Sequence, residues 1–326
     1  KIQQYNIKKY RNMRKFKKHK NNQFCMEKKY KNIFNGLYFL GYRDNTEYEK
    51  AKIVILPVAY QGTCTWLKGT KNGPKAILNA SYATEPFDEE AIFSLDKLGI
   101  YTLKIQTFSD KEKANKVVNI TKSITNQILN DNKFPIIVGG EHSISIGSIQ
   151  AVAEKFNDIS VLQFDAHTDI DGARKNFIHH HSTMARVILE TTKITITQVG
   201  IRSCIEKDLE YAKRKNISIF FAHDIVNKKH KIKDILSTLK KNIYITIDVD
   251  AFDPSIFPNT GTPEPNGLKW QYVINLIKEV AKTRNIIGLD IVEHASKNPN
   301  KPHYSDYNAT KLLHKVLCII FKNKIK

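Results

Sequence analysis

The chain has 326 residues, of which 41% are hydrophobic and 26% are charged, and its formal net charge is +20. These proportions are ordinary for a globular protein and exclude disorder over most of the chain. No stretch reaches the roughly 18 consecutive apolar residues that a membrane-spanning helix requires, so we expect a soluble protein without a membrane partner.

Much of the excess positive charge lies at the N-terminus. Residues 1–31 contain 12 Lys and Arg residues and a single acidic residue, Glu27, so their charge is +11 and the rest of the chain carries +9. We interpret residues 1–32 as a basic, mobile extension, with organelle targeting or contact with an anionic surface as alternatives. Nucleic-acid binding is not expected, because no known binding module accompanies the basic residues.

The spacing of the cysteines does not predict a framework of disulfide bonds. Four are present, and they lie far apart in the sequence: Cys25, Cys64, Cys204 and Cys318. A core of this size does not need disulfides, and the spacing lacks the close pairs of zinc knuckles or redox dithiols. We therefore expect reduced thiols and a cytoplasmic protein.

From about residue 33 onward, short Ile- and Val-rich runs alternate with longer amphipathic segments. This alternation predicts βαβ units, hence an α/β protein with a mainly parallel sheet, and a single domain over residues 33–326. In chain order, the predicted strands are residues 52–56, 135–138, 159–164, 193–199, 218–221, 242–247 and 286–291. The predicted helices are residues 111–130, 144–156, 207–215, 231–240, 270–283 and 308–321.

Polar clusters follow three of the predicted strands: residues 139–143 (GGEHS), 165–169 (DAHTD) and 248–254 (DVDAFDP). Ligands of open parallel sheets bind at the carboxyl ends of the strands, so these positions favour function over packing. In the second cluster the three potential ligands, Asp165, His167 and Asp169, stand at alternate positions, and alternate side chains of an extended segment point to the same side. Carboxylates gathered there are costly to bury unless a cation binds them.

Six candidate ligands from the three clusters provide two imidazoles and four carboxylates. They are His142, Asp165, His167, Asp169, Asp248 and Asp250. Four negative charges balance two divalent cations, and oxygen ligands with some imidazole suit Mn²⁺ better than the thiolate-rich sites that favour zinc. The sequence therefore predicts a binuclear metal site with two Mn²⁺ ions per subunit.

These motifs, with the third continuing to residue 268, resemble the signatures of the ureohydrolases, the group of arginase, agmatinase and formiminoglutamase. The resemblance extends over about residues 33–322. It implies a three-layer arginase-like fold, with a central parallel sheet flanked by helices, and a homo-oligomer, a trimer or a hexamer. It also implies two manganese ions and a metal-bridging hydroxide that attacks the carbon of a guanidinium group, releasing urea and an amine.

The resemblance also assigns roles to single residues. All six predicted ligands match those of the family, and Asp169 is expected in addition to orient the hydroxide. Among the three histidines at 179–181, His181 aligns best with a histidine that shuttles protons and contacts the substrate, although the register stays open. Glu293 aligns with the carboxylate that pairs with the substrate guanidinium, and Asp171 is a further candidate for substrate binding.

Agmatine, cleaved to putrescine and urea, is the substrate that the sequence favours. Residues 171–177 do not reproduce the Asn and Ser spacing with which arginases hold the substrate carboxylate. Arg174 and Lys175 could nevertheless attract a carboxylate, which keeps arginine or another guanidino acid as an alternative. A non-catalytic structural or regulatory subunit is a further alternative. Asn259 and Asn266 replace glycines that are usual in the family, which predicts altered turns.

Overall fold

The computed structural model describes residues 37–41, 46–171 and 179–324. The predicted basic extension, the boundary after residue 32, Cys25, Arg174 and Lys175 lie outside these ranges. Within the described ranges, no helix is both long enough and apolar enough to cross a membrane.

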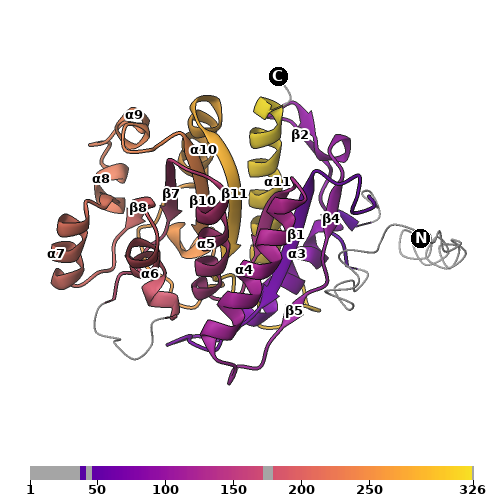
Figure 1. Ribbon diagram of the computed structural model, residues 1–326, viewed down its shortest axis with the longest axis horizontal. Helices are drawn as coiled ribbons and strands as arrows, with labels where there is room; N and C mark the ends of the chain where they lie inside the picture. Colours follow the sequence, from indigo (N-terminus) through magenta and orange to yellow (C-terminus); the bar gives the residue numbers. More distant parts are fainter. Residues whose placement is uncertain (1–36, 42–45, 172–178, 325–326) are drawn as a thin grey trace, which may run out of the picture. The chain divides into compact units, whose positions relative to one another are not determined.

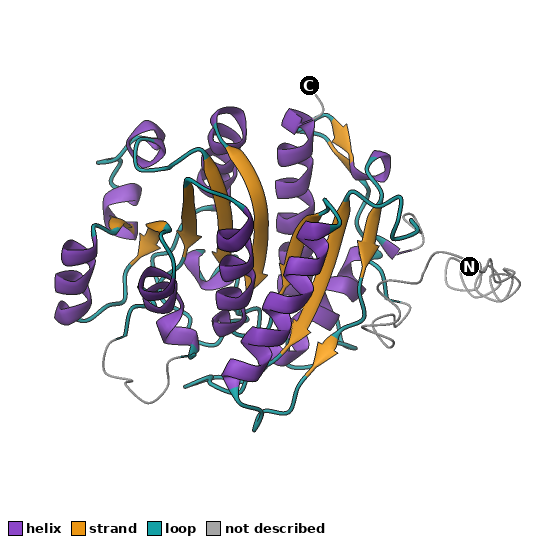
Figure 2. Cartoon of the chain, in the orientation of Figure 1, coloured by secondary structure: helices purple, strands orange, loops and turns teal. Residues whose placement is uncertain are grey.

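A central sheet of nine strands organises the described residues (Figures 1 and 2). Its order is β4-β1-β6-β11-β10-β7-β8-β9, with β5 also paired to β1, and every pairing in it is parallel. The strands are β1 (Ile53–Ala59), β4 (Ile100–Thr102), β5 (Gln106–Thr107), β6 (Phe134–Val138), β7 (Ile159–Phe164), β8 (Thr195–Ile201), β9 (Ser218–Phe221), β10 (Asn242–Asp248) and β11 (Asn285–Val292). A separate antiparallel pair joins β2 (Phe87–Asp88) and β3 (Phe93–Ser94). The predicted fold class is confirmed.

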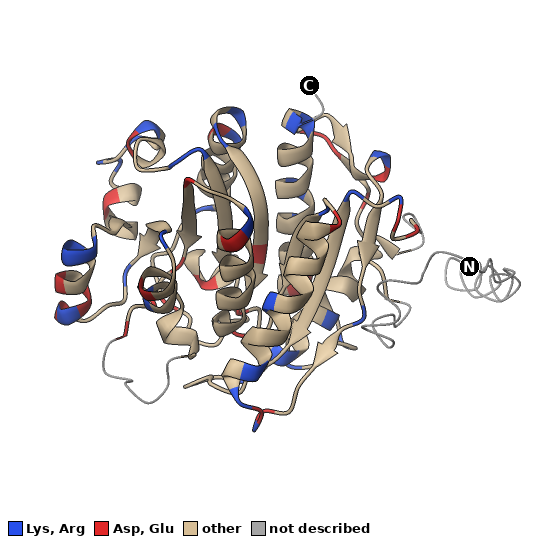
Figure 3. Ribbon diagram, viewed as in Figure 1, with Lys and Arg blue, Asp and Glu red and all other residues tan. Residues whose placement is uncertain are grey.

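Helices cover both faces of this sheet, which gives the three layers. They are α3 (Gly73–Ser81), α4 (Ala114–Asn130), α5 (Ser145–Lys155), α6 (Met184–Thr191), α7 (Glu206–Lys215), α8 (Ala222–Val226), α9 (Ile232–Leu236), α10 (Trp270–Thr283) and α11 (Tyr304–Lys324). Helices α3, α10 and α11 pack on one face, while α4, α5 and α6 pack on the other. Helix α7 carries acidic residues in its first turn and basic residues in its last, which complements the helix dipole (Figure 3).

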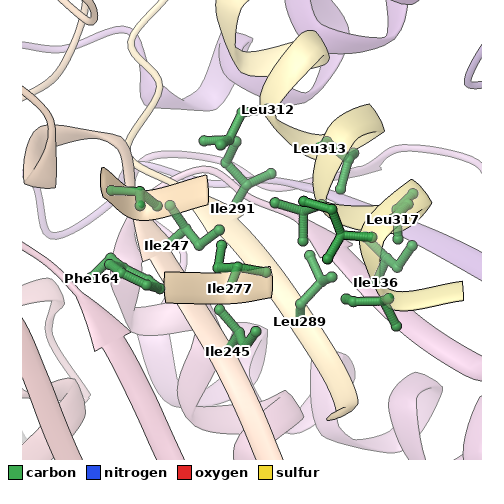
Figure 4. Packing of buried hydrophobic residues seen from close by; sticks show 14 of the residues in the cluster. Ile136, Phe164, Ile245, Ile247, Ile277, Leu289, Ile291, Leu312, Leu313 and Leu317 are labelled. Atoms are coloured by element: carbon green, nitrogen blue, oxygen red, sulfur yellow. The ribbon is translucent and has the colours of Figure 1, made fainter. Parts of the chain in front are cut away.

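Alternate residues of the central strands enter two separate hydrophobic cores. In β10, Ile243, Ile245 and Ile247 face the core beneath α10 and α11, whereas Tyr244 joins the core beneath α4 and α5. Figure 4 shows Ile245 and Ile247 packed with Leu289 and Ile291 of β11 and with residues of α10 and α11. Since both faces of these strands are buried, they are apolar almost throughout, as the sequence runs indicate.

Several predicted boundaries were wrong. The helix predicted over 231–240 ends at Leu236, because the chain turns at Ser237 toward β10, and the last predicted helix is longer at both ends. Helices α3, α6 and α8 lie outside the predicted ranges. Gly73-Pro74 indicates a turn in sequence, yet a proline fits the first turn of a helix, where its missing N–H needs no partner.

The sheet order determines where the site forms. Strands β6, β11, β10 and β7 are consecutive neighbours, although they are far apart in the sequence. Because the strands are parallel, the polar segments that follow them meet at one edge of the sheet. Gly140 permits this convergence, since a Cβ atom there would collide with the backbone of Tyr60 beyond β1.

Candidate metal centre

The first ligand group surrounds His142, which begins the short turn η5 (His142–Ile144) after β6. The ring Nδ1 atom lies 2.9 Å from Oδ2 of Asp169, 3.2 Å from Oδ2 of Asp165 and 3.5 Å from Oδ2 of Asp248. Asp165 and Asp169 follow β7, and Asp248 ends β10. All four side chains are buried. Three strands thus deliver four ligand atoms to one point.

The second ligand group surrounds His167. Its Nδ1 atom lies 3.0 Å from Oδ2 of Asp250 and 3.7 Å from Oδ1 of Asp165. Asp165 therefore belongs to both groups and presents a different carboxylate oxygen to each. Two adjacent cation sites that share Asp165 fit this arrangement. All six predicted ligands lie together here, and their binding of metal remains a prediction.

Two buried atoms without hydrogen-bond partners indicate that a cation fits the first ligand group. His142 Nδ1 and Asp169 Oδ2 are fully buried, and among the described residues neither has a hydrogen-bond partner, although they lie 2.9 Å apart. Buried polar atoms are ordinarily hydrogen-bonded, because leaving them unpaired costs about 1–3 kcal/mol. Ligands of one cation approach each other closely without hydrogen bonding, so the geometry fits a bound metal.

The other ring nitrogen of His142 indicates which tautomer is present. Thr246 donates its hydroxyl proton to Asp290 Oδ1 at 2.6 Å, so the same oxygen can only accept from His142 Nε2, which lies 2.8 Å away. When the ring is neutral its proton therefore resides on Nε2, and the Nδ1 lone pair is directed at the carboxylates. Support of this kind behind a histidine is typical of metal ligands.

The electrostatics of the site reflect the crowding of its carboxylates. Burial, assisted by Asp165, raises the pKa of Asp169 to about 6, and burial with Asp250 raises that of Asp248 well above its usual value. Burial alone would lower the pKa of His167, but Asp250 and Asp165 raise it to about 12. Protons thus partly balance the crowded carboxylates, and divalent cations could replace them.

His181 and Glu293 lie beside the ligand groups. His181 begins the turn η6 (His181–Thr183), and its Nδ1 atom is 4.0 Å from Oε1 of Glu293. Glu293 follows β11, and the same Oε1 atom accepts a hydrogen bond of 2.7 Å from the backbone N–H of His142. Glu293 adopts the left-handed backbone conformation (φ 62°), which is uncommon for a residue other than glycine. The chain thus accepts local strain at this position.

The neighbouring histidines lie differently. His180 is buried, and its Nδ1 atom accepts a hydrogen bond from the backbone N–H of Ser182, so this ring caps the turn η6. His179 is half-buried, and burial lowers its pKa. This geometry favours His181 among the three. Asp171, the other predicted substrate contact, exchanges hydrogen bonds with Ser182, and its role remains a prediction.

Sequence reasoning missed the residues that support the site. Thr246 and Asp290 stand behind His142. Thr63 and Thr65 contact His181, and Glu141 accepts a hydrogen bond from Thr63. Thr246 and Asp290 interrupt otherwise apolar buried strands, and such an interruption was the available signal. Thr63 and Thr65 belong to the segment that follows β1. The carboxyl end of β1 also faces the site.

The turn at Asn266, one of the two positions where asparagine replaces a glycine usual in the family, forms without that glycine. Asn266 adopts the left-handed conformation (φ 61°), which asparagine tolerates better than most residues. The next residue, Gly267, donates its N–H to Asp253 Oδ2, and a Cβ atom there would collide with the backbone of Phe252. The loop after β10 therefore turns at residues 266–267 with asparagine in the left-handed conformation, and a difference from the family's turn remains a prediction.

A model of the arginase family matches residues 51–318 of this chain. The chain belongs to the arginase family. A curated relative, the N(1)-aminopropylagmatine ureohydrolase of Synechocystis sp., is 31% identical over an alignment of 278 residues that covers 83% of this chain and 90% of the relative. The family assignment made from the sequence motifs, and with it the assignment as a hydrolase, is confirmed.

Solved structures of arginase-family proteins share the fold. The crystal structure of agmatine ureohydrolase of Thermoplasma volcanium superposes with a TM-score of 0.77 and 27% identity, covering 91% of this chain and 99% of that one. Trypanosoma cruzi formiminoglutamase, solved with Mn²⁺, gives a TM-score of 0.77 at 21% identity, covering 88% and 99%. At 21% identity, the similarity to the formiminoglutamase shows a shared fold alone.

Proposed function

We propose that this arginase-family enzyme is a binuclear manganese ureohydrolase that cleaves agmatine to putrescine and urea. The observation that carries the proposal is the sharing of Asp165 between the His142 and His167 groups, next to the pair formed by Glu293 and His181. A two-cation site thus adjoins an acidic group suited to a guanidinium and an imidazole suited to proton transfer.

The metal ligands would divide between two positions. His142, Asp165, Asp169 and Asp248 would hold one cation, and His167 and Asp250 would hold the other together with Asp165. Mainly carboxylate ligands with one imidazole each suit Mn²⁺. Two such cations would supply a nucleophile at neutral pH by lowering the pKa of bound water, and a guanidinium, a poor electrophile, requires one.

Glu293 would hold the substrate guanidinium. Burial and the charge of Glu141 raise the pKa of Glu293 well above its usual value, so a cationic group beside it would offset both effects. A carboxylate can meet the planar guanidinium through two hydrogen bonds. Gly261 lies beside Oε2 of Glu293, and its lack of a side chain leaves space there.

His181 would act as the acid. Attack on the guanidinium carbon gives a tetrahedral species whose amine must be protonated before it leaves. Imidazole exchanges protons near neutral pH, and the Nδ1 atom of His181 faces the carboxylate that would hold the guanidinium. Asp169, with its unpaired Oδ2 atom, would orient the nucleophile, and Asp171 would contact the substrate.

The names of relatives support an amine substrate and introduce a second candidate. The Synechocystis relative is named for N(1)-aminopropylagmatine, and the Thermoplasma enzyme for agmatine. Both compounds carry a guanidinium on an alkyl chain that ends in a positive charge. N(1)-aminopropylagmatine is therefore the alternative substrate, and arginine or another guanidino acid is disfavoured.

The decisive experiment measures urea release by the Mn²⁺-loaded protein from agmatine, N(1)-aminopropylagmatine, arginine and guanidinobutyrate. We expect the highest kcat/KM with one of the two amines. A preference for arginine or guanidinobutyrate would overturn the substrate assignment. Absence of urea from all four compounds, with less than about one Mn²⁺ bound per chain, would support the non-catalytic alternative.

A further inference from the structure

The segment after β1, residues 61–68, reaches across to His181 at two points. The backbone N–H of His181 donates a hydrogen bond of 3.0 Å to Oγ1 of Thr63. The ring Nε2 atom lies 3.3 Å from Oγ1 of Thr65. Two threonine hydroxyls therefore fix both the backbone and the ring of the histidine, whose opposite ring nitrogen faces Glu293.

Glu141 in turn fixes Thr63. Its Oε1 atom accepts a hydrogen bond of 2.5 Å from the Thr63 hydroxyl, and its Oε2 atom accepts one of 2.7 Å from the Thr63 backbone N–H. Ser143 donates a third, of 2.6 Å, to Oε1. Glu141 is completely buried and belongs to neither ligand group, although it adjoins His142 in the sequence.

The direction of these hydrogen bonds makes a chain from Glu141 to His181. The Thr63 hydroxyl has one proton, which it donates to Glu141, so its lone pair is free to accept from the N–H of His181. A valine at this position would remove both bonds and preserve the volume of the side chain. A serine would keep the hydroxyl.

We propose that Glu141 and Thr63 are positioning residues that hold His181 where it can deliver a proton to the leaving amine. The proposal rests on the role of His181 in the proposed function. A rigid support is needed there because the histidine lies on a turn, and a misplacement of about 1 Å can lower a rate by about 10²-fold. Thr65 is the second support, acting on the ring.

A double-mutant cycle on urea release from agmatine tests this dependence. We expect Thr63→Val to lower kcat by about 10- to 100-fold with little change in KM and in bound Mn²⁺. In a His181→Ala background the same substitution should lower kcat by less than about twofold, since it acts only through that side chain. Thr63→Ser should restore most of the rate.

Full additivity, in which Thr63→Val lowers kcat equally with and without His181, would overturn the proposal, as would failure of serine to restore the rate. Thr283→Val, on an exposed residue at the opposite end of the sheet, is the matched control and should leave kcat unchanged. If Thr63→Val does not fold, the double-mutant cycle with His181→Ala can be measured with Thr65→Val on the same segment. Wild-type protein that releases no urea would instead refute the proposed function.

Discussion

The Nδ1 atom of His181 lies 4.0 Å from Oε1 of Glu293. The two residues come from different segments, a turn before α6 and the end of β11. Their approach places an imidazole next to the carboxylate that would bind the guanidinium. The same carboxylate oxygen also accepts the N–H of His142, so the proposed acid, the proposed substrate contact and the first ligand group lie next to one another.

His181→Ala should therefore separate catalysis from metal binding. We expect kcat to fall by about 10²- to 10⁴-fold, the usual contribution of general acid catalysis, while bound Mn²⁺ stays near the wild-type amount. Urea release and elemental analysis of the same preparation measure both quantities. Added imidazole should restore part of the rate.

The neighbouring histidines provide the controls. His179→Ala should retain the rate, whereas His180→Ala should lower the melting temperature, because its buried ring caps the turn that carries His181. A variant of His180 that lost the rate, together with a variant of His181 that kept it, would shift the assignment by one residue. Full activity in all three would remove proton transfer from this turn.

Asp165→Asn should affect both cation positions at once. Asp165 is the only residue shared by the two ligand groups identified in the described residues, and the substitution removes a charge that balances the cations. We expect loss of activity and less than about half of the wild-type Mn²⁺. Asp250→Asn, which belongs to the second group alone, should retain more metal than Asp165→Asn. Equal metal contents in the two variants would argue against a shared ligand.

Metal binding should release protons and strengthen as the pH rises. Burial alone would lower the pKa of His142, but the carboxylates of Asp165, Asp169 and Asp248 beside its ring raise it well above the usual value, and that of His167 rises to about 12. We therefore expect both rings to carry a proton in metal-free protein near neutral pH, and each would lose it on binding a cation. Calorimetry of Mn²⁺ binding in buffers of different ionisation enthalpy measures the release. Binding independent of pH between 6 and 8 would contradict this.

The sequence predicted the ligand clusters because each stands directly after an apolar strand, as the segment after β7 illustrates. It could not predict that strands β6, β11, β10 and β7 are neighbours, since strand order depends on long-range pairing. The resemblance to a known family implied a central parallel sheet and a common set of ligands, without the order of the strands. Short elements were missed for a related reason. Strands β4 and β5 have two or three residues and exist only because β1 pairs with them.

The supporting residues were less predictable still. Glu141 and Thr63 are 78 positions apart, and nothing local indicates that their side chains meet. His180 and His181 are adjacent and chemically identical, yet one ring caps a turn while the other faces Glu293. Only the backbone path through η6 distinguishes them.

Deletion of residues 1–31 should leave kcat of the remaining chain nearly unchanged. The family match begins at residue 51, and all the ligands lie between His142 and Asp250. Urea release from agmatine and Mn²⁺ content, measured for the shortened and full chains, test the expectation. An insoluble or inactive product would show that the segment is required by the domain.

The last prediction concerns a buried ion pair away from the site. Lys315 on α11 lies 2.8 Å from Oδ2 of Asp88 and 3.1 Å from Oε2 of Glu90, and Asp88 is completely buried. Lys315→Met would leave the Asp88 carboxylate without its cation. Breaking a buried pair in this way costs about 3–5 kcal/mol, which urea denaturation can measure.

The loss of unfolding free energy caused by Lys315→Met should depend on pH. Burial alone would raise the pKa of Asp88, but the hydrogen bond and charge of Lys315 lower it below its usual value. The pair therefore stabilises the fold above the unfolded-state pKa of an aspartate, and this stabilisation is lost as the pH falls through the lowered pKa. The difference in unfolding free energy between wild type and Lys315→Met should accordingly be largest near pH 7 and shrink in acid.

Adding Asp88→Asn to Lys315→Met should recover part of the lost stability at pH 7, because the amide keeps the oxygen that accepts from the N–H of Ala91 without leaving a buried charge. A double variant no more stable than Lys315→Met alone would show that the lysine acts through packing.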